Sequence, residues 1–373
     1  MNAHQKFVVT VCAAVTLLFL TFTLLLVLRG ERFQPELPGF SFGESPYRWV
    51  ETVLDRNLPG RGLAAALRVR AELLIGQECV DGIYSRDGVL IEKLAPPAPD
   101  ASAAIAEDVR AFAAASSSQV YFMAVPTAYE FIQNRFPLCT PEWSQRVYTK
   151  ELVGQLAGYV RELDIYAELA NADNSDVWFR TETLWTAESA YIGYRSFAAA
   201  TGLYPQPLNK FNLEVVSYDF SGALRRALYG AAGDPDRIDL YYDPHTPDAA
   251  SIERYTAVGT ETPGSVYARE WLSSERQDNV FLGEDCALTR IRTVVANERK
   301  LLVIGDGFAD VICPFFLRNY GQIDLVKLPM LTEETAALVR QEEYSAVLMV
   351  FGVDTLTDPD CTDALSLLIP AEE

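Results

Sequence analysis

The sequence predicts an α/β protein with a mainly parallel sheet. Four short, largely apolar runs occupy residues 120–125, 301–304, 323–326 and 346–351. Apolar runs of this kind are typical of strands that are covered on both faces, as in parallel sheets. Segments with helical character separate the last three runs, at residues 309–319 and 333–341. This β-α-β-α-β order predicts right-handed crossovers and a doubly wound sheet.

The N-terminal part of the chain predicts a membrane anchor. Residues 7–28 carry no charge, and 22 residues at about 1.5 Å each can cross a hydrocarbon core of roughly 30 Å. We expect a short cytoplasmic tail at residues 1–6 and a single-pass signal anchor at residues 7–28. The alternative is a cleaved signal peptide, whose apolar region is shorter, about 7–15 residues. No small-residue cleavage pattern follows residue 28, which favours the anchor.

The remaining chain is expected to lie outside the cytoplasm. Residues 29–56 contain proline and glycine and read as a stalk. Residues 57–373 then form one domain, with a weakly periodic insertion at about residues 203–300. Within this domain, a turn at residues 85–88 between two apolar runs predicts a hairpin, and residues 103–115 predict a helix.

Composition excludes some classes of partner. The formal charge is −20, from 31 basic and 51 acidic residues, which argues against nucleic acid and against broad contact with anionic lipid. None of the six cysteines forms a C-x-x-C pair, so a zinc site is not expected. One or two disulfides and free buried thiols are both compatible with the sequence. No metal and no cofactor are expected.

A turn at residues 305–308 follows the run at residues 301–304 and precedes a helical segment. Ligands of open α/β sheets bind beyond the carboxyl ends of the strands, and residues 126–128 and 352–355 occupy equivalent ends. In enzymes that hold a nucleophile on such a turn, the third turn residue is a serine. Here it is Gly307, so the sequence predicts the frame of an esterase without its nucleophile.

A second segment, Phe-Arg-Thr-Glu-Thr-Leu-Trp-Thr at residues 179–186, precedes a helical stretch that begins Ala-Glu-Ser-Ala-Tyr. Together with the turn at residues 305–308, it resembles the bacterial DHHW family, which is related to alginate O-acetyltransferases of the SGNH-hydrolase type. Further pieces in the same order lie at residues 124–127, 216–220, 281–283 and 352–356. The resemblance covers about residues 57–356 and implies an SGNH-hydrolase-like three-layer sandwich.

The resemblance also implies where a catalytic site would lie. In the acetyltransferase relatives a serine attacks the acyl group, and an Asp-x-His pair orients and deprotonates that serine. The aspartate position is Glu182, the base position is Leu184, and the serine position is Gly307. Four motif residues are retained: Arg180, Trp185, Thr186 and Asp306. Histidine is needed as base because its pKa lies near neutrality, so both losses disable the chemistry.

Other residues of the sequence are poor candidates for the missing base or nucleophile. His4 lies in the expected tail and His245 in an acidic, proline-containing loop that favours an exposed position. Thr186 and Ser189 stand at a helix start, where hydroxyls cap N–H groups. A carboxylate dyad of Glu182 and Asp306 is conceivable, but a buried hydrogen-bonding role is expected for Glu182.

A group of four aspartates could suggest a calcium loop, but it lacks the spacing and turn glycine of an EF-hand. The four are Asp234, Asp236, Asp239 and Asp243. A solvated acidic rim beside an edge strand is expected instead.

The sequence therefore predicts a non-catalytic pseudoenzyme in cell-envelope glycan binding or assembly. Its expected partners are an envelope polysaccharide or membrane acyltransferase machinery. The alternative is an active O-acetyltransferase or esterase with a displaced triad. A third reading is a decayed paralogue that has no ligand.

Overall fold

The computed structural model describes residues 61–136, 142–172, 177–246 and 248–370. The chain divides into two compact units, residues 1–68 and 69–373, and helix α3 (Arg61–Leu74) contains the boundary. The expected tail, anchor and stalk lie outside the described residues. In the part of the chain that the structure describes, no helix is long and apolar enough to cross a membrane.

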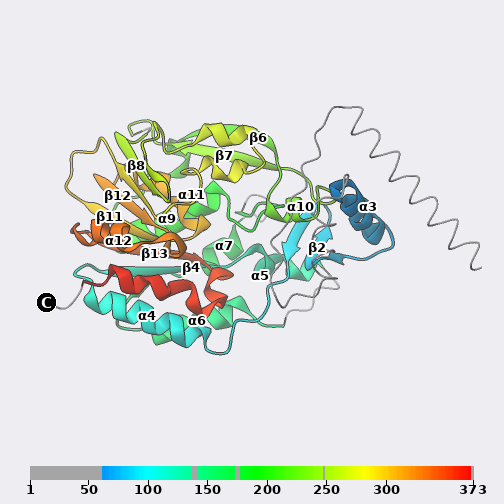
Figure 1. Ribbon diagram of the computed structural model, residues 1–373, viewed down its shortest axis with the longest axis horizontal. Helices are drawn as coiled ribbons and strands as arrows, with labels where there is room; N and C mark the ends of the chain where they lie inside the picture. Colours follow the sequence, from blue (N-terminus) through cyan, green and yellow to red (C-terminus); the bar gives the residue numbers. More distant parts are fainter. Residues whose placement is uncertain (1–60, 137–141, 173–176, 247, 371–373) are drawn as a thin grey trace, which may run out of the picture. The chain divides into compact units, whose positions relative to one another are not determined.

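An eight-stranded sheet forms the centre of the second unit, in the order β5-β4-β13-β11-β12-β10-β8-β9 (Figure 1). Its strands are β4 (Val120–Val125), β5 (Arg161–Glu162), β8 (Ser251–Thr256), β9 (Gly259–Glu261), β10 (Leu288–Arg292), β11 (Lys300–Gly305), β12 (Gln322–Val326) and β13 (Ala346–Gly352). The five strands from β5 to β12 in this order are parallel to one another. The four predicted runs are β4, β11, β12 and β13, and they are adjacent in the sheet.

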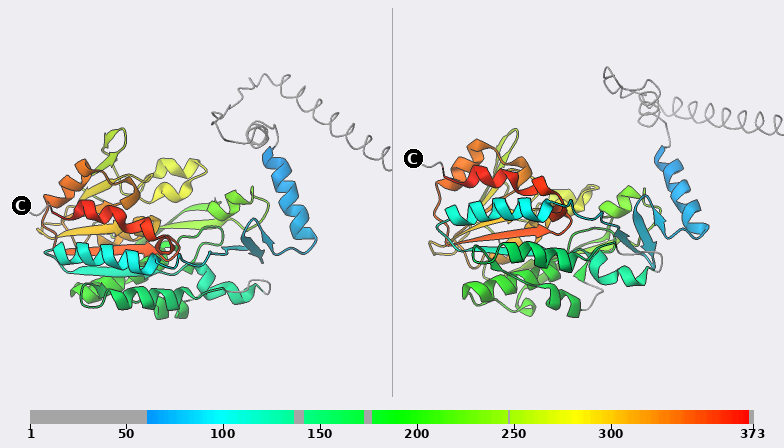
Figure 2. Two further views of the ribbon diagram at one scale, coloured as in Figure 1. Left: turned by 60° about the horizontal axis from the view of Figure 1, so that its bottom comes forward. Right: turned by 90° about the horizontal axis from the view of Figure 1, so that it is seen from below.

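Helices cover both faces of this sheet and give three layers (Figure 2). The central strand β13 is buried along its whole length, and its side chains alternate between two cores. Val347 and Met349 pack with α4 (Ala101–Ala115), α12 (Glu333–Arg340) and the C-terminal 3₁₀ helix η8 (Pro359–Leu368). Leu348 and Val350 pack on the other face with α9 (Ala187–Thr201) and α11 (Gly307–Ile312). This two-sided burial explains why β13 is apolar throughout.

The expected insertion at residues 203–300 is part of the sheet. It supplies β10, β8 and β9, which extend the sheet in antiparallel fashion beyond β12. The sheet is thus mixed, and the expectation of a mainly parallel sheet holds only for its β5-to-β12 part. The insertion also forms a separate two-stranded sheet of β6 (Asn212–Phe220) and β7 (Asp236–Tyr242).

The predicted hairpin is confirmed as β2 (Ile83–Arg86) and β3 (Val89–Glu92), with β1 (Cys79–Val80) on its edge. The turn residues Asp87 and Gly88 have φ values of 50° and 76°. Two consecutive left-handed residues are typical of the tight turns that match strand twist. The hairpin contacts the motif segment, because the Leu90 N–H donates to the Arg180 carbonyl at 2.7 Å.

Shorter helices and 3₁₀ turns complete the second unit. The helices are α5 (Ala128–Ile132), α6 (Gln145–Gln155), α7 (Tyr166–Asn171) and α10 (Ala223–Ala227). The 3₁₀ turns that matter below are η4 (Gln277–Val280) and η5 (Cys313–Phe316). The predicted helix at residues 309–319 is therefore α11 followed by η5.

Candidate functional site

The motif segment at residues 179–186 leads directly into α9. Thr186 caps this helix, since its Oγ1 accepts from the Ser189 N–H at 3.4 Å. Ser189 Oγ donates to the Val177 carbonyl at 2.6 Å. Thr186 thus has the capping role that its position predicts, whereas Ser189 binds a carbonyl of the preceding segment instead of capping an N–H group.

Trp185 connects the motif segment to the turn at residues 305–308. Its side chain is fully buried, and its indole Nε1–H donates to the Phe308 carbonyl at 3.1 Å. The two rings also meet edge to face, with centroids 5.7 Å apart. The retained tryptophan therefore holds together the two sequence segments that carry the family resemblance.

Asp306 connects the carboxyl ends of β11 and β13. Its Oδ1 accepts from the Phe308 N–H at 3.0 Å, which caps α11. Its Oδ2 accepts from the Gly352 N–H and from the Thr355 hydroxyl, each at 2.7 Å. Burial raises the pKa of Asp306, although these donors partly offset that effect. The predicted convergence of residues 305–308 and 352–355 is confirmed.

Glu182 is buried and committed to backbone donors. Its Oε2 accepts from the Ala223 N–H at 2.5 Å, at the start of α10, and its Oε1 accepts from the Thr183 N–H at 2.9 Å. The Arg226 guanidinium lies 3.8 Å away. Desolvation raises the pKa of Glu182. Since Glu182 and Asp306 both bind backbone N–H groups, the geometry favours structural roles over a carboxylate dyad.

Leu184 and Gly307 are direct neighbours. A Cβ atom added to Gly307 would lie 3.0 Å from Leu184 Cδ2, and the three nearest atoms of other segments all belong to the Leu184 side chain. The leucine thus stands beside the turn position that the family resemblance assigns to a nucleophile. Glu182, Leu184 and Gly307 line one cleft, with a volume of about 320 Å³.

Two glycines of this turn are constrained differently. A Cβ on Gly305 would lie 2.1 Å from the Val350 carbonyl oxygen, which is backbone and cannot move aside. The atoms nearest to a Cβ on Gly307 belong instead to a flexible side chain. Gly307 also begins a helix, and inside helices alanine is favoured over glycine by up to about 1 kcal/mol.

We therefore expect Gly305→Ala to destabilise the fold by about 3 kcal/mol or more, as overpacking against backbone does at its upper range. Gly307→Ala should change stability by less than about 1 kcal/mol. Urea denaturation of the two variants measures the difference. Equal losses would mean that Gly307 is required by the backbone.

The cleft has a polar wall that sequence reasoning did not identify. Asn279, in η4, is 7% exposed, and its Nδ2 has no hydrogen-bond partner among the described residues. Leu282 follows with φ of 65° while buried, and a bulky residue in this region is an outlier that costs about 1–3 kcal/mol. The only indication of this wall in the sequence was the segment at residues 281–283, which resembles the DHHW family.

Lys327 is a buried cation below the same turn. It follows β12 directly and is 6% exposed. Its Nζ donates to the Asp306 carbonyl at 2.6 Å and to Asp310 Oδ2 at 2.7 Å. Burial lowers the pKa of Lys327, but attraction to Asp310 and Asp285 outweighs it and raises the pKa. Asp310 lines the cleft, and burial raises its pKa to about 7 despite the lysine.

Buried carboxyls predict a pH dependence of stability. Burial and repulsion from Asp306 raise the pKa of Asp354 to about 7, as burial does for Asp310. In the unfolded chain such groups titrate near about 3.9. The unfolded state therefore binds fewer protons between these values, and stability falls as pH rises through this window.

Other carboxyls act in the opposite direction. Hydrogen bonding to Arg146 lowers the pKa of Asp164, so its stabilisation is lost only as the pH falls below about 4. We expect the melting temperature to be highest near about pH 5 and to fall towards pH 8. Calorimetry across this range measures it, and a maximum at pH 8 would contradict the raised pKa values.

The aspartates at residues 234–243 do not form a solvated rim, which corrects the expectation for two of them. Asp236 is buried and accepts from the Arg180 N–H at 2.7 Å and the Thr181 N–H at 2.9 Å. Asp243 is buried beside the Arg318 guanidinium at 3.1 Å. The reason is that β7 pairs with β6 and presents Asp236 to the backbone of the motif segment.

His245 is exposed, as its loop sequence predicts. In the described ranges, no group of three or more His, Cys, Asp or Glu residues could hold a metal ion. The cysteines at positions 79, 286, 313 and 361 are free, while Cys12 and Cys139 lie outside the described residues. The guanidinium end of Arg180 lines a second pocket, whereas its backbone N–H serves Asp236.

Solved structures of other proteins have a fold similar to that of this chain. A DHHW family protein from Eubacterium siraeum has a similar solved structure, with a TM-score of 0.64 and 19% identity, over 79% of this chain and 98% of that one. Bacillus cereus PatB1 gives a TM-score of 0.62 and 17% identity, over 74% and 96% of the two chains. No curated protein sequence matches. The family model described as DHHW protein matches residues 98–326, and because this span exceeds half of the 373 residues, the chain belongs to the DHHW family.

Proposed function

We propose that this chain is a non-catalytic homologue of polysaccharide O-acetyltransferases and that it binds an envelope glycan. The observation that carries the proposal is the contact of Leu184 with the Gly307 position. A leucine cannot take a proton from a nucleophile, and a glycine has no side chain to attack an ester. The site thus lacks two of the three groups that acyl transfer requires.

Binding, rather than complete decay, is supported by the cleft itself. Asn279 keeps a buried amide without a partner among the described residues, and Leu282 keeps a strained backbone beside it. Both features lower the stability of the folded chain when no ligand is bound. A ligand that accepts a hydrogen bond from Asn279 would explain the first of them.

The proposal places the chain at the cell membrane. Residues 7–28 anchor it as a single pass, with the C-terminal domain outside the cytoplasm. An envelope polysaccharide or membrane acyltransferase machinery is the proposed partner. Retention of the full chain in membranes after an alkaline wash, together with protease access to the domain in spheroplasts, tests this placement. Release into the soluble fraction would contradict the anchor.

The catalytic part of the proposal is tested with a fluorophosphonate probe and a chromogenic acetyl ester. We expect no labelling and no acetyl release by the purified full chain above the rate without protein. Thr186→Ala and Ser189→Ala serve as hydroxyl-deletion controls. Strong labelling that one such deletion abolishes would establish the alternative, an active O-acetyltransferase or esterase with a displaced triad.

A further inference from the structure

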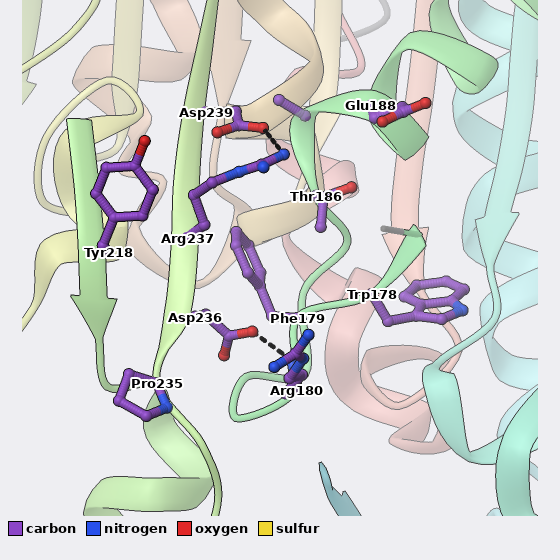
Figure 3. A pocket seen from close by; sticks show the side chains of 11 residues that line it. Trp178, Phe179, Arg180, Thr186, Glu188, Tyr218, Pro235, Asp236, Arg237 and Asp239 are labelled. Carbon is purple, nitrogen blue, oxygen red and sulfur yellow. Dashed lines mark hydrogen bonds and ion pairs between the residues drawn. The ribbon is translucent and has the colours of Figure 1, made fainter. Parts of the chain in front are cut away.

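A second pocket is lined by the first residues of the motif segment, by β7 and by Tyr218 of β6. Its volume is about 210 Å³, and it lies between β7 and the segment that leads into α9 (Figure 3). This is smaller than the roughly 300–1,000 Å³ of sites for drug-sized ligands. The pocket suits one ring-sized group rather than a nucleotide or a cofactor.

An exposed aromatic ring forms one wall of this pocket. Tyr218 projects from β6 and is 75% exposed, and Figure 3 shows it beside Arg237 of the neighbouring strand. Phe179 contributes a second aromatic ring to the lining. Aromatic rings offer large apolar faces, so the pocket has a surface for a flat ligand with apolar C–H groups.

The charges in the pocket do not select an anion. The Arg237 guanidinium pairs with Asp239 Oδ2 at 2.6 Å, which largely neutralises it. The other carboxylate oxygen, Asp239 Oδ1, is buried and has no hydrogen-bond partner among the described residues. A carboxylate oxygen only accepts hydrogen bonds. The net charge of −20 further disfavours a polyanion.

From these contacts we propose that the pocket at Tyr218 binds one neutral pyranose residue of a polysaccharide. The ring stacks on Tyr218 through its C–H face, and its hydroxyls meet the polar side chains that line the pocket. The exposed Arg180 side chain provides further donors at the pocket wall. This assignment rests on the proposed glycan-binding function, and it specifies the class of sugar and the place of contact.

Titration calorimetry of the full chain in detergent tests the assignment, with the neutral probes chitotetraose, cellotetraose and mannotetraose and with acidic oligomannuronate. We expect at least one neutral probe to bind. Tyr218→Ala should weaken that binding about ten-fold, which corresponds to about 1.4 kcal/mol. Tyr218→Phe keeps the ring and should stay within about two-fold. Tyr204→Ala removes another exposed tyrosine, 86% exposed and outside the pocket, and should have no effect.

The outcomes separate this inference from the function on which it rests. Neutral-sugar binding that is unchanged in Tyr218→Ala would overturn the pocket assignment and leave glycan binding in place. Binding of oligomannuronate alone would overturn the neutral class. If no saccharide binds the wild-type chain, both the pocket assignment and the proposed glycan-binding function are wrong.

Discussion

Ester hydrolysis is expected to appear when Leu184→His and Gly307→Ser are made together. A Cβ on residue 307 lies 3.0 Å from the residue 184 side chain, so the new hydroxyl and imidazole would be neighbours. A positioned general base contributes about 10²–10⁴-fold. We expect hydrolysis of a chromogenic acetyl ester about 10²-fold above wild type, together with fluorophosphonate labelling.

The single variants are the matched controls. Gly307→Ser alone supplies a hydroxyl without a base and places it against Leu184, whereas Leu184→His alone supplies a base without a nucleophile. Neither should exceed wild type, because groups that act as one unit are strongly non-additive. Glu182→Asp can be added as a third change. It shortens a side chain that binds the Ala223 N–H, so its effect on stability must be measured separately.

The double variant is informative only when folded, which its melting temperature and circular dichroism establish. If it is folded and inert while an active relative hydrolyses the same ester, the cleft has diverged beyond these two positions. That result would leave the non-catalytic proposal intact and would remove the idea of a preserved acetyltransferase geometry.

The parts of the fold predicted from sequence are those with strong local signals. The strands β4, β11 and β13 are largely buried and mostly apolar on both faces, and the cap at Thr186 needs only neighbouring residues. The prediction that Leu184 and Gly307 belong to one site came from two motif segments, which occur in the same order as in the DHHW family. Each of these signals is contained within a few residues.

The parts that were missed depend on distant pairing. Strand β8 reads Ser-Ile-Glu-Arg-Tyr-Thr, and such a polar sequence does not resemble a strand until β10 pairs with it. Asp236 is buried because the backbone of Thr181, 55 residues away, needs its acceptors. The burial of Asn279 could not be predicted from the sequence, since a single asparagine in a loop is ordinarily solvated.

The second prediction of a large effect concerns stability and the ion pair of Lys327 and Asp310, next to the turn at residues 305–308. Lys327→Met is expected to destabilise the fold by about 3–5 kcal/mol at pH 8, the usual consequence of leaving one member of a buried pair without its partner. The Lys327 side chain is 8% exposed, and that of Asp310 is 15% exposed. Neither charge can therefore be fully hydrated in the folded state.

The loss should depend on pH in a defined direction. Asp310 already has a pKa of about 7 beside the lysine, and removal of that cation raises the pKa further. At about pH 5 the carboxyl of the variant is protonated, so no unpaired charge is buried and the loss is smaller. As the pH rises from about 7 towards this raised pKa, the folded variant must keep a proton that the folded wild type releases, and the loss grows.

Urea denaturation at pH 5 and pH 8 measures both values, and the double variant Lys327→Met with Asp310→Leu is the control. Apolar replacement of a whole buried pair is often neutral, so the double variant should lie near wild type at both pH values. An equal loss for Lys327→Met at both pH values would mean that the missing donor to the Asp306 carbonyl, rather than the Asp310 charge, is responsible. Because Lys327 holds the turn backbone and Asp310 lines the cleft, either result identifies which contact of Lys327 stabilises the turn beside the cleft.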